Sequence, residues 1–146
     1  ESLVVLVGNF DRDLSNYLMA VGSDNVRLAD LDDVSPLFKG SFDTRGLLSF
    51  NIAGVREDGA RPSYEGGITL RDGEFDSPLL AKPLKEVNAT VDFDGNRAAI
   101  DLAGMKAGTS SVYGRAEVLD IADRSVKFEL FAPRFNTADF FRRKKK

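Results

Sequence analysis

The segment VNATVDFDGNRAAIDLA, residues 87–103, decides the fold class. Its first seven residues alternate between apolar and polar side chains, which is the period of a β-strand with one buried face. Asp94-Gly95-Asn96 then supplies turn residues, and Ala98, Ile100 and Leu102 resume the alternation. The segment therefore predicts a β-hairpin with one apolar and one polar face.

The same alternation recurs on both sides of this hairpin. Downstream, residues 112–118 and 126–130 alternate and are joined by a turn-rich stretch. Upstream, two more hairpins are predicted, one with its turn at residues 43–46 and one with its turn at residues 71–73. Consecutive strands joined by short connections predict an antiparallel all-β meander and argue against βαβ units.

One stretch near the start has a helical period instead. Residues 13–22 have apolar side chains at i, i+3, i+4 and i+7, namely Leu14, Tyr17, Leu18 and Val21. Asp13 is a suitable N-cap and Gly22 a suitable stop, so a short amphipathic helix is predicted there. Residues 28–34 form a second, weaker helical candidate.

Composition excludes most familiar active-site chemistry. The chain has 146 residues, a size that suits one domain, and it contains no cysteine and no histidine. Disulfides, thiolate nucleophiles, serine-histidine triads and histidine-based metal sites are therefore excluded. Residues 92–96 place oxygen ligands as a calcium loop does, but Arg97 occupies the position that needs glycine. We expect no enzymatic activity, no cofactor and no metal.

The charge is distributed unevenly. The formal net charge is -3, but residues 142–146 are all basic, and without them 15 basic residues face 23 acidic ones, a balance of -8. An acidic body disfavours nucleic-acid binding. We expect a single domain over residues 1–141, followed by a basic tail that is solvated and disordered or added for expression. The alternative is that Phe140 and Phe141 bring this tail to an anionic membrane surface.

The apolar positions of the predicted strands form one stripe. Its members are Ile68, Leu70, Val91, Phe93, Ile100, Leu102, Val112, Val118, Val126, Phe128 and Leu130. One interpretation is that they close the core of a structural sandwich or barrel. The other is that a curved sheet leaves them open to hydrocarbon chains lying across the strands. A carbohydrate-binding or adhesion domain is a third interpretation, which the absence of Trp disfavours.

Several longer patterns resemble a known family. They are the run G-x-I-x-L-x-D-G-x-F at residues 66–75, the proline-led hairpin at 78–103, the strand SVYGRAEV at 111–118 and the closing VKFELFAPRFNTADF at 126–140. Together they resemble the C-terminal region of the AsmA-like proteins, the bacterial envelope group that includes TamB and YhdP. The resemblance spans residues 13–140.

The resemblance implies a fold, a location and a function. The fold would be a curved sheet forming a groove, a taco or an open half-barrel. The chain would belong to a periplasmic protein that an N-terminal helix, not present here, anchors in the inner membrane. Its groove would bind phospholipid acyl chains and contribute to lipid transport or outer-membrane assembly, with other envelope proteins or further modules of the same chain as partners. At 146 residues and starting at Glu1, the chain would be one part of a longer protein.

Overall fold

The computed structural model describes residues 5–31, 43–78 and 80–142. In this part of the chain there are eight strands and two short helices. They are β1 (Val5–Phe10), β2 (Tyr17–Arg27), α1 (Leu28–Leu31), β3 (Asp43–Arg56), β4 (Ser63–Asp76), β5 (Leu84–Gly95), β6 (Arg97–Ala107), β7 (Ser110–Asp120), β8 (Ser125–Arg134) and α2 (Thr137–Phe140).

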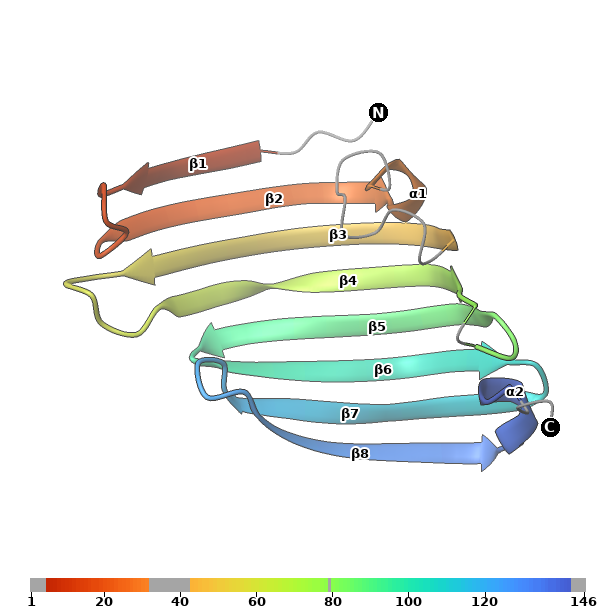
Figure 1. Ribbon diagram of the computed structural model, residues 1–146. Helices are drawn as coiled ribbons and strands as arrows, with labels where there is room; N and C mark the ends of the chain where they lie inside the picture. Colours follow the sequence, from red (N-terminus) through yellow and green to blue (C-terminus); the bar gives the residue numbers. More distant parts are fainter. Residues whose placement is uncertain (1–4, 32–42, 79, 143–146) are drawn as a thin grey trace.

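All eight strands belong to one sheet whose spatial order is the order of the sequence, β1 to β8. Every neighbouring pair is antiparallel. Figure 1 shows the strands stacked from β1 to β8 with the first and last far apart. The predicted antiparallel all-β meander is confirmed, and the sheet stays open.

The described residues form one layer of sheet. The solvent-accessible surface of the chain is 10612 Å², whereas a compact globular protein of this mass exposes about 7,400 Å². The solvent-accessible surface is larger than that of a compact protein because no second layer covers either face of the sheet. The described residues therefore form neither a closed sandwich nor a closed barrel, which was the alternative interpretation of the apolar stripe.

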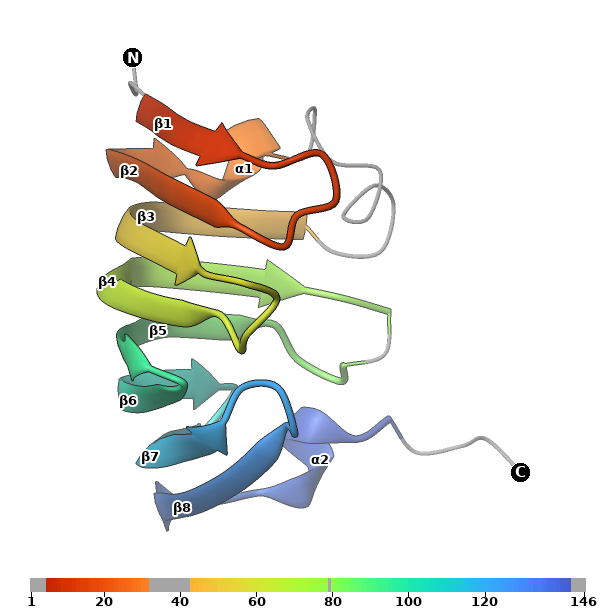
Figure 2. The same cartoon turned by 90° about the vertical axis from the view of Figure 1, so that its left-hand side faces the viewer.

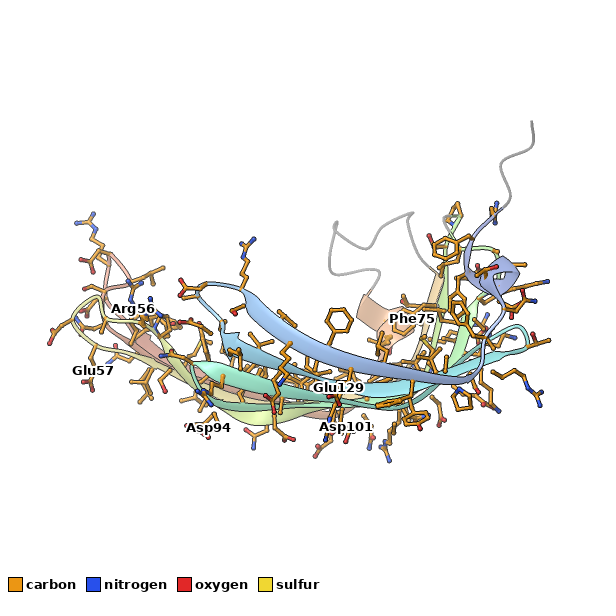
Figure 3. All side chains as sticks on the ribbon, turned by 90° about the horizontal axis from the view of Figure 1, so that it is seen from below. Arg56, Glu57, Phe75, Asp94, Asp101 and Glu129 are labelled. Carbon is orange, nitrogen blue, oxygen red and sulfur yellow. The ribbon has the colours of Figure 1, made fainter. Side chains whose placement is uncertain are left out.

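The sheet is curved along a line of irregularities that crosses it near one end. The register shifts in β2 between Ser23 and Val26, in β3 between Arg45 and Leu47, in β4 between Leu70 and Gly73, in β5 between Lys85 and Asn88, and in β6 between Leu102 and Met105. β-Bulges bend a strand and increase its twist. Because the bulges are aligned on consecutive strands, their bends add up to the trough seen in Figure 3.

Several residues along this line of bulges have left-handed backbone conformations. Gly46 has φ 130°, and Asn25, Asp72 and Glu86 have φ between 51° and 52°. A Cβ on Gly46 would lie 2.8 Å from the Cα atom of Gly73, so two strands approach closely where both residues are glycine.

Polar side chains connect the bulges of neighbouring strands. Arg71 donates a hydrogen bond to the side chain of Asn25. The amide of Asp72 donates to Oδ1 of Asn88 at 3.1 Å. Lys106 and Glu86 form an ion pair at 2.7 Å. Backbone groups that leave the regular ladder at a bulge thus find partners nearby.

The two predicted upstream turns are wrong. Residues 43–46 lie inside β3 and residues 71–73 inside β4, and both strands run on for 14 residues. The glycines and aspartates that resemble turn residues lie at the bulges instead, where Gly46 and Asp72 have positive φ, a conformation that glycine and aspartate adopt more readily than most residues. The two downstream hairpins are confirmed as β5–β6 and β7–β8.

The predicted helix at residues 13–22 is also wrong. Residues 17–22 belong to β2, and the segment before them is a turn in which Leu14 has φ 57°. Leu18 and Ala20 are apolar although they lie on the side of β2 opposite Val21, so the strand does not alternate between apolar and polar residues. The helical spacing of its apolar residues is a coincidence. Residues 28–31 do form the helix α1, while the rest of that second candidate lies outside the described residues.

The buried apolar side chains concentrate at the end of the sheet beside the bulges. Val26, Val87, Ala107 and Val112 lie there, and Ala98 lies nearer the other end. In Figure 2 both helices project from the same side of the stacked strands. Neither helix in the described part of the chain is long and apolar enough to cross a membrane.

The basic tail is described only at its first residue. Nε of Arg142 donates to the carbonyl of Leu80 at 3.0 Å. Residues 143–146 lie outside the described residues, so the state of the tail stays a prediction.

We predict that Gly46→Ala lowers the free energy of unfolding by about 1–3 kcal/mol, because a Cβ would be strained at φ 130° and would meet Gly73. Chemical unfolding monitored by circular dichroism measures the change. Gly104→Ala is the control, since no atom lies within 4 Å of the added Cβ, and its effect should stay within about 0.5 kcal/mol. Gly104 lies on the same bulge line in β6, so equal effects of the two variants would contradict the assignment of Gly46 as the position where φ and the close approach of Gly73 exclude a side chain.

Candidate functional site: the concave apolar face

The two faces of the sheet differ in chemistry. Figure 3 shows the sheet as a trough with Asp94 and Asp101 on its convex side and Phe75 on its concave side. Side chains alternate along a strand, so the neighbours Ile100 and Leu102 lie on the side opposite Asp101. The concave side therefore carries the apolar half of the alternating pattern.

Strand register extends this apolar half across the whole sheet. One row joins Leu6, Val21, Ile52, Gly66, Phe93, Ala98, Val118 and Val126, one residue from each strand. The next row runs Ser23, Phe50, Ile68, Val91, Ile100, Ala116 and Phe128, and a third runs Val26, Leu48, Leu70, Ala89, Leu102, Gly114 and Leu130. Apart from Ser23, these rows contain only apolar residues.

All eleven residues of the predicted stripe lie on this concave side. Ten of them belong to the three rows, and Val112 follows at the next concave position of β7, opposite Met105. In the middle strands these side chains are half-buried by their cross-strand neighbours. At the edge they are open, with Phe128 67% and Leu130 59% exposed.

The sequence stripe missed the half of the face formed by β1 to β3. Leu48, Phe50 and Ile52 alternate as strand residues do and could have been added. Leu6 and Val21 could not, because their neighbours in the sequence are apolar as well. Because β1 and β2 have apolar residues on both sides, their sequence does not show which side faces the trough.

The face is large enough for a hydrocarbon chain. Eight strands about 4.8 Å apart span roughly 34 Å across the sheet, and the three rows are contiguous. One leaflet of a bilayer core is about 15 Å thick, which is the depth that one acyl chain fills. An exposed apolar area of this extent normally marks a site for a ligand or partner.

Two glycines, Gly66 and Gly114, leave positions in the apolar rows without a side chain. A Cβ on Gly66 would overlap the carbonyl oxygen of Asn51, and one on Gly114 would overlap that of Glu129. Gly66 also has φ 111°. Neither position accepts a side chain, so the rows dip at these two points.

One rim of the trough, at the β1–β2 and β3–β4 turns, carries aromatic rings, two of which have hydroxyl groups. The ring centroids of Phe10 and Tyr17 are 6.1 Å apart, and those of Tyr64 and Phe93 are 6.5 Å apart. The hydroxyls of Tyr17 and Tyr64 are hydrogen-bonded at 3.3 Å, which raises the pKa of Tyr17. Such rings suit a boundary between hydrocarbon and water.

The opposite rim, at the β4–β5 and β6–β7 turns, is held by the C-terminal segment. Asp139 in α2 accepts hydrogen bonds from Oγ of Ser110 at 2.7 Å and from the amide and hydroxyl of Thr109, both at 3.1 Å. The Ser110 hydroxyl is the main reason why the pKa of Asp139 lies below its usual value. The amide of Lys82 donates to the Asp139 carbonyl at 3.0 Å, which joins the segment to the β4–β5 loop.

The convex face carries charged side chains and exposed apolar ones. Val5, Val7, Leu18, Val55 and Leu119 are exposed there, as are the stacked rings of Tyr113 and Phe131, whose centroids are 5.4 Å apart. Arg115 and Glu129 form an ion pair at 3.0 Å between β7 and β8, and Lys85 approaches Glu74 at 4.0 Å between β5 and β4. No group of three or more His, Asp or Glu side chains in the described ranges could hold a metal ion. The site is therefore described by shape and apolarity.

Comparison of the chain with protein-family models, with curated proteins and with solved structures finds no significant match.

We predict that the Asp139 contacts stabilise the fold in a pH-dependent way. Their contribution is fully present above the ordinary aspartate pKa of about 3.9 and is lost as pH falls through the lowered pKa of the folded state. Asp139→Asn should therefore cost stability at pH 7 and progressively less as pH falls below 4, measured by urea unfolding at each pH.

Asp92→Asn, on the convex face of β5, is the control and should change stability by no more than about 0.5 kcal/mol at pH 7. A cost of Asp139→Asn that does not vary with pH would show that its carboxylate charge contributes nothing.

Proposed function

We propose that this chain is a non-catalytic module that shelters lipid acyl chains on its concave face. The observation that supports the proposal is the set of three contiguous apolar rows that crosses the concave face of an open sheet, whereas the convex face mixes charged and apolar side chains. A soluble sheet with one polar and one apolar face must have its apolar face covered by something. Hydrocarbon is a cover that needs no matching hydrogen bonds.

The energetics support this assignment. Removing an acyl chain from water is worth about 0.8 kcal/mol per CH₂ group. A trough that covers ten methylenes would therefore offset several kcal/mol of the cost of extracting a lipid. An apolar lining is non-directional, so a chain could slide along the rows without breaking specific bonds.

The two rims of the trough suit an amphipathic ligand. The hydroxyls of Tyr17 and Tyr64 lie at one rim, where a polar headgroup would meet water. The other rim is tied by Asp139 and the β4–β5 loop. A lipid would therefore bind with its tail over the rows and its headgroup toward the tyrosine rim or an edge strand.

The resemblance to the AsmA-like proteins is consistent with this proposal and extends it. The chain would act in the periplasm as part of an inner-membrane-anchored protein and contribute to phospholipid transport or outer-membrane homeostasis. Further modules of the same chain or other envelope proteins would lengthen the trough. The curved open sheet is the fold which that resemblance implies.

We predict that the purified chain takes up a fluorescent acyl probe and that Ile68→Glu abolishes the uptake, because it places a charge in the middle row. Thr69→Glu is the matched control on the convex side of the same strand and should leave uptake unchanged. Probe fluorescence measures uptake, and native mass spectrometry of protein purified from cells detects bound lipid.

If the unsubstituted chain carries no lipid and takes up no probe, the proposal is wrong, and a scaffold whose concave face is covered by another protein becomes the better explanation. Equal loss in the two variants would indicate that the concave face is not the binding surface.

A further inference from the structure

No strand among the described residues pairs with the outer edge of β8. β8 is the last strand of the sheet, and all ten of its residues are exposed. After β8 the chain turns inward, since Asp139 is bonded to Ser110 and Phe141 pairs with Leu80. An edge of this kind presents backbone donors and acceptors that pair readily with a further strand.

Charges on the convex side specify what that strand must carry. Asp101, Arg115 and Glu129 face one another on consecutive strands, so their signs alternate toward the edge. In the next row Glu117 faces Lys127. A strand added to β8 continues the alternation only if it places a cation beside Glu129 and an anion beside Lys127.

We propose that a second copy of this chain supplies that strand, with the two β8 strands antiparallel about a two-fold axis at Phe128. Lys127 of each copy then faces Glu129 of the other on the convex side. On the concave side Phe128 faces Phe128, and Val126 faces Leu130. At these three central positions the strand is complementary to itself in both charge and apolarity, as an isologous interface requires. The outermost pair of the register joins Ser125 to Phe131 on the convex side.

The same charges exclude the neighbouring registers. A shift of two residues in one direction places Lys127 opposite Lys127, and in the other direction it places Glu129 opposite Glu129. A shift of one residue turns the apolar side of one strand to the convex face. Pro133, which lacks an amide donor, lies beyond the segment 125–131 that this register pairs.

Pairing in this register joins two sheets of eight strands into one. The two-fold axis is perpendicular to the sheet, so both concave faces lie on the same side and the apolar rows continue across the seam. The exposed Phe128 and Leu130 side chains become interior members of longer rows. The interface stands on β8 alone and does not depend on whether the trough binds lipid.

Cross-linking tests the register, because the chain contains no cysteine of its own. Phe128→Cys should form a disulfide-linked dimer in the presence of a thiol oxidant, since opposed Cβ atoms are about 4.5–5.5 Å apart. Val126→Cys is the control and should not cross-link, because the two cysteines would be separated by about four residues along the strands. Cross-linking at 126, or at neither position, would overturn the proposal.

Charge exchange tests the pairing itself. Sedimentation velocity should show a concentration-dependent dimer for the parent and loss of that dimer for K127E and for E129K. An equimolar mixture of the two variants should recover it as a heterodimer, because every facing pair is again opposite in sign. Each variant also places like charges across β7–β8, so its stability is measured first; this internal cost is the same in the mixture.

Recovery in the mixture therefore reports the intermolecular contact alone. A parent that stays monomeric, variants that still dimerise, or a mixture that does not would each overturn the proposal.

Discussion

Register is the constraint on which this structure depends. Along every strand from β1 to β8 one side is apolar, and antiparallel pairing aligns those sides into rows. A slip of a single residue at any pairing would turn the apolar sides of all strands beyond that pairing to the convex face. Because no second layer of the described chain covers the sheet, register alone separates the two faces, and the trough, its floor and its edge chemistry all follow from it.

The bulge line turns this two-faced sheet into a trough. A flat sheet would expose its apolar rows fully, whereas a bend brings the rows closer together and shelters them from water. Gly46, Asp72 and Glu86 have positive φ at consecutive strands, and polar side chains tie the bulges together on the way across. The same bend brings the C-terminal segment over one end, where Asp139 holds it.

The sequence predicted a strand and its apolar side correctly where apolar and polar residues alternate along that strand. The β5–β6 hairpin alternates apolar with charged residues, so both its existence and its apolar side were evident, and the eleven stripe residues came from strands of this kind. In β2 both sides are apolar, and a chance helical spacing of the apolar residues led to the wrong prediction of a helix. At Asp72-Gly73 the bulge has residue types that also favour turns, and Asp72 has positive φ there. Only pairing with a distant strand distinguishes the two structures. Whether the apolar stripe is open or closed depends on the number of layers, which local pattern cannot reveal.

The central claim is that the concave face of the folded chain is open to water and is covered when hydrocarbon is present. Single cysteines introduced one at a time at residues 90–93 of β5 test it directly, through their rate of reaction with a charged maleimide before and after incubation with phospholipid vesicles. We predict that all four positions react in the lipid-free protein, and that lipid protects Val91→Cys and Phe93→Cys while Thr90→Cys and Asp92→Cys stay reactive. The claim would be contradicted if the cysteines at 91 and 93 did not react in lipid-free protein, or if lipid protected positions 90 and 92 as much as 91 and 93.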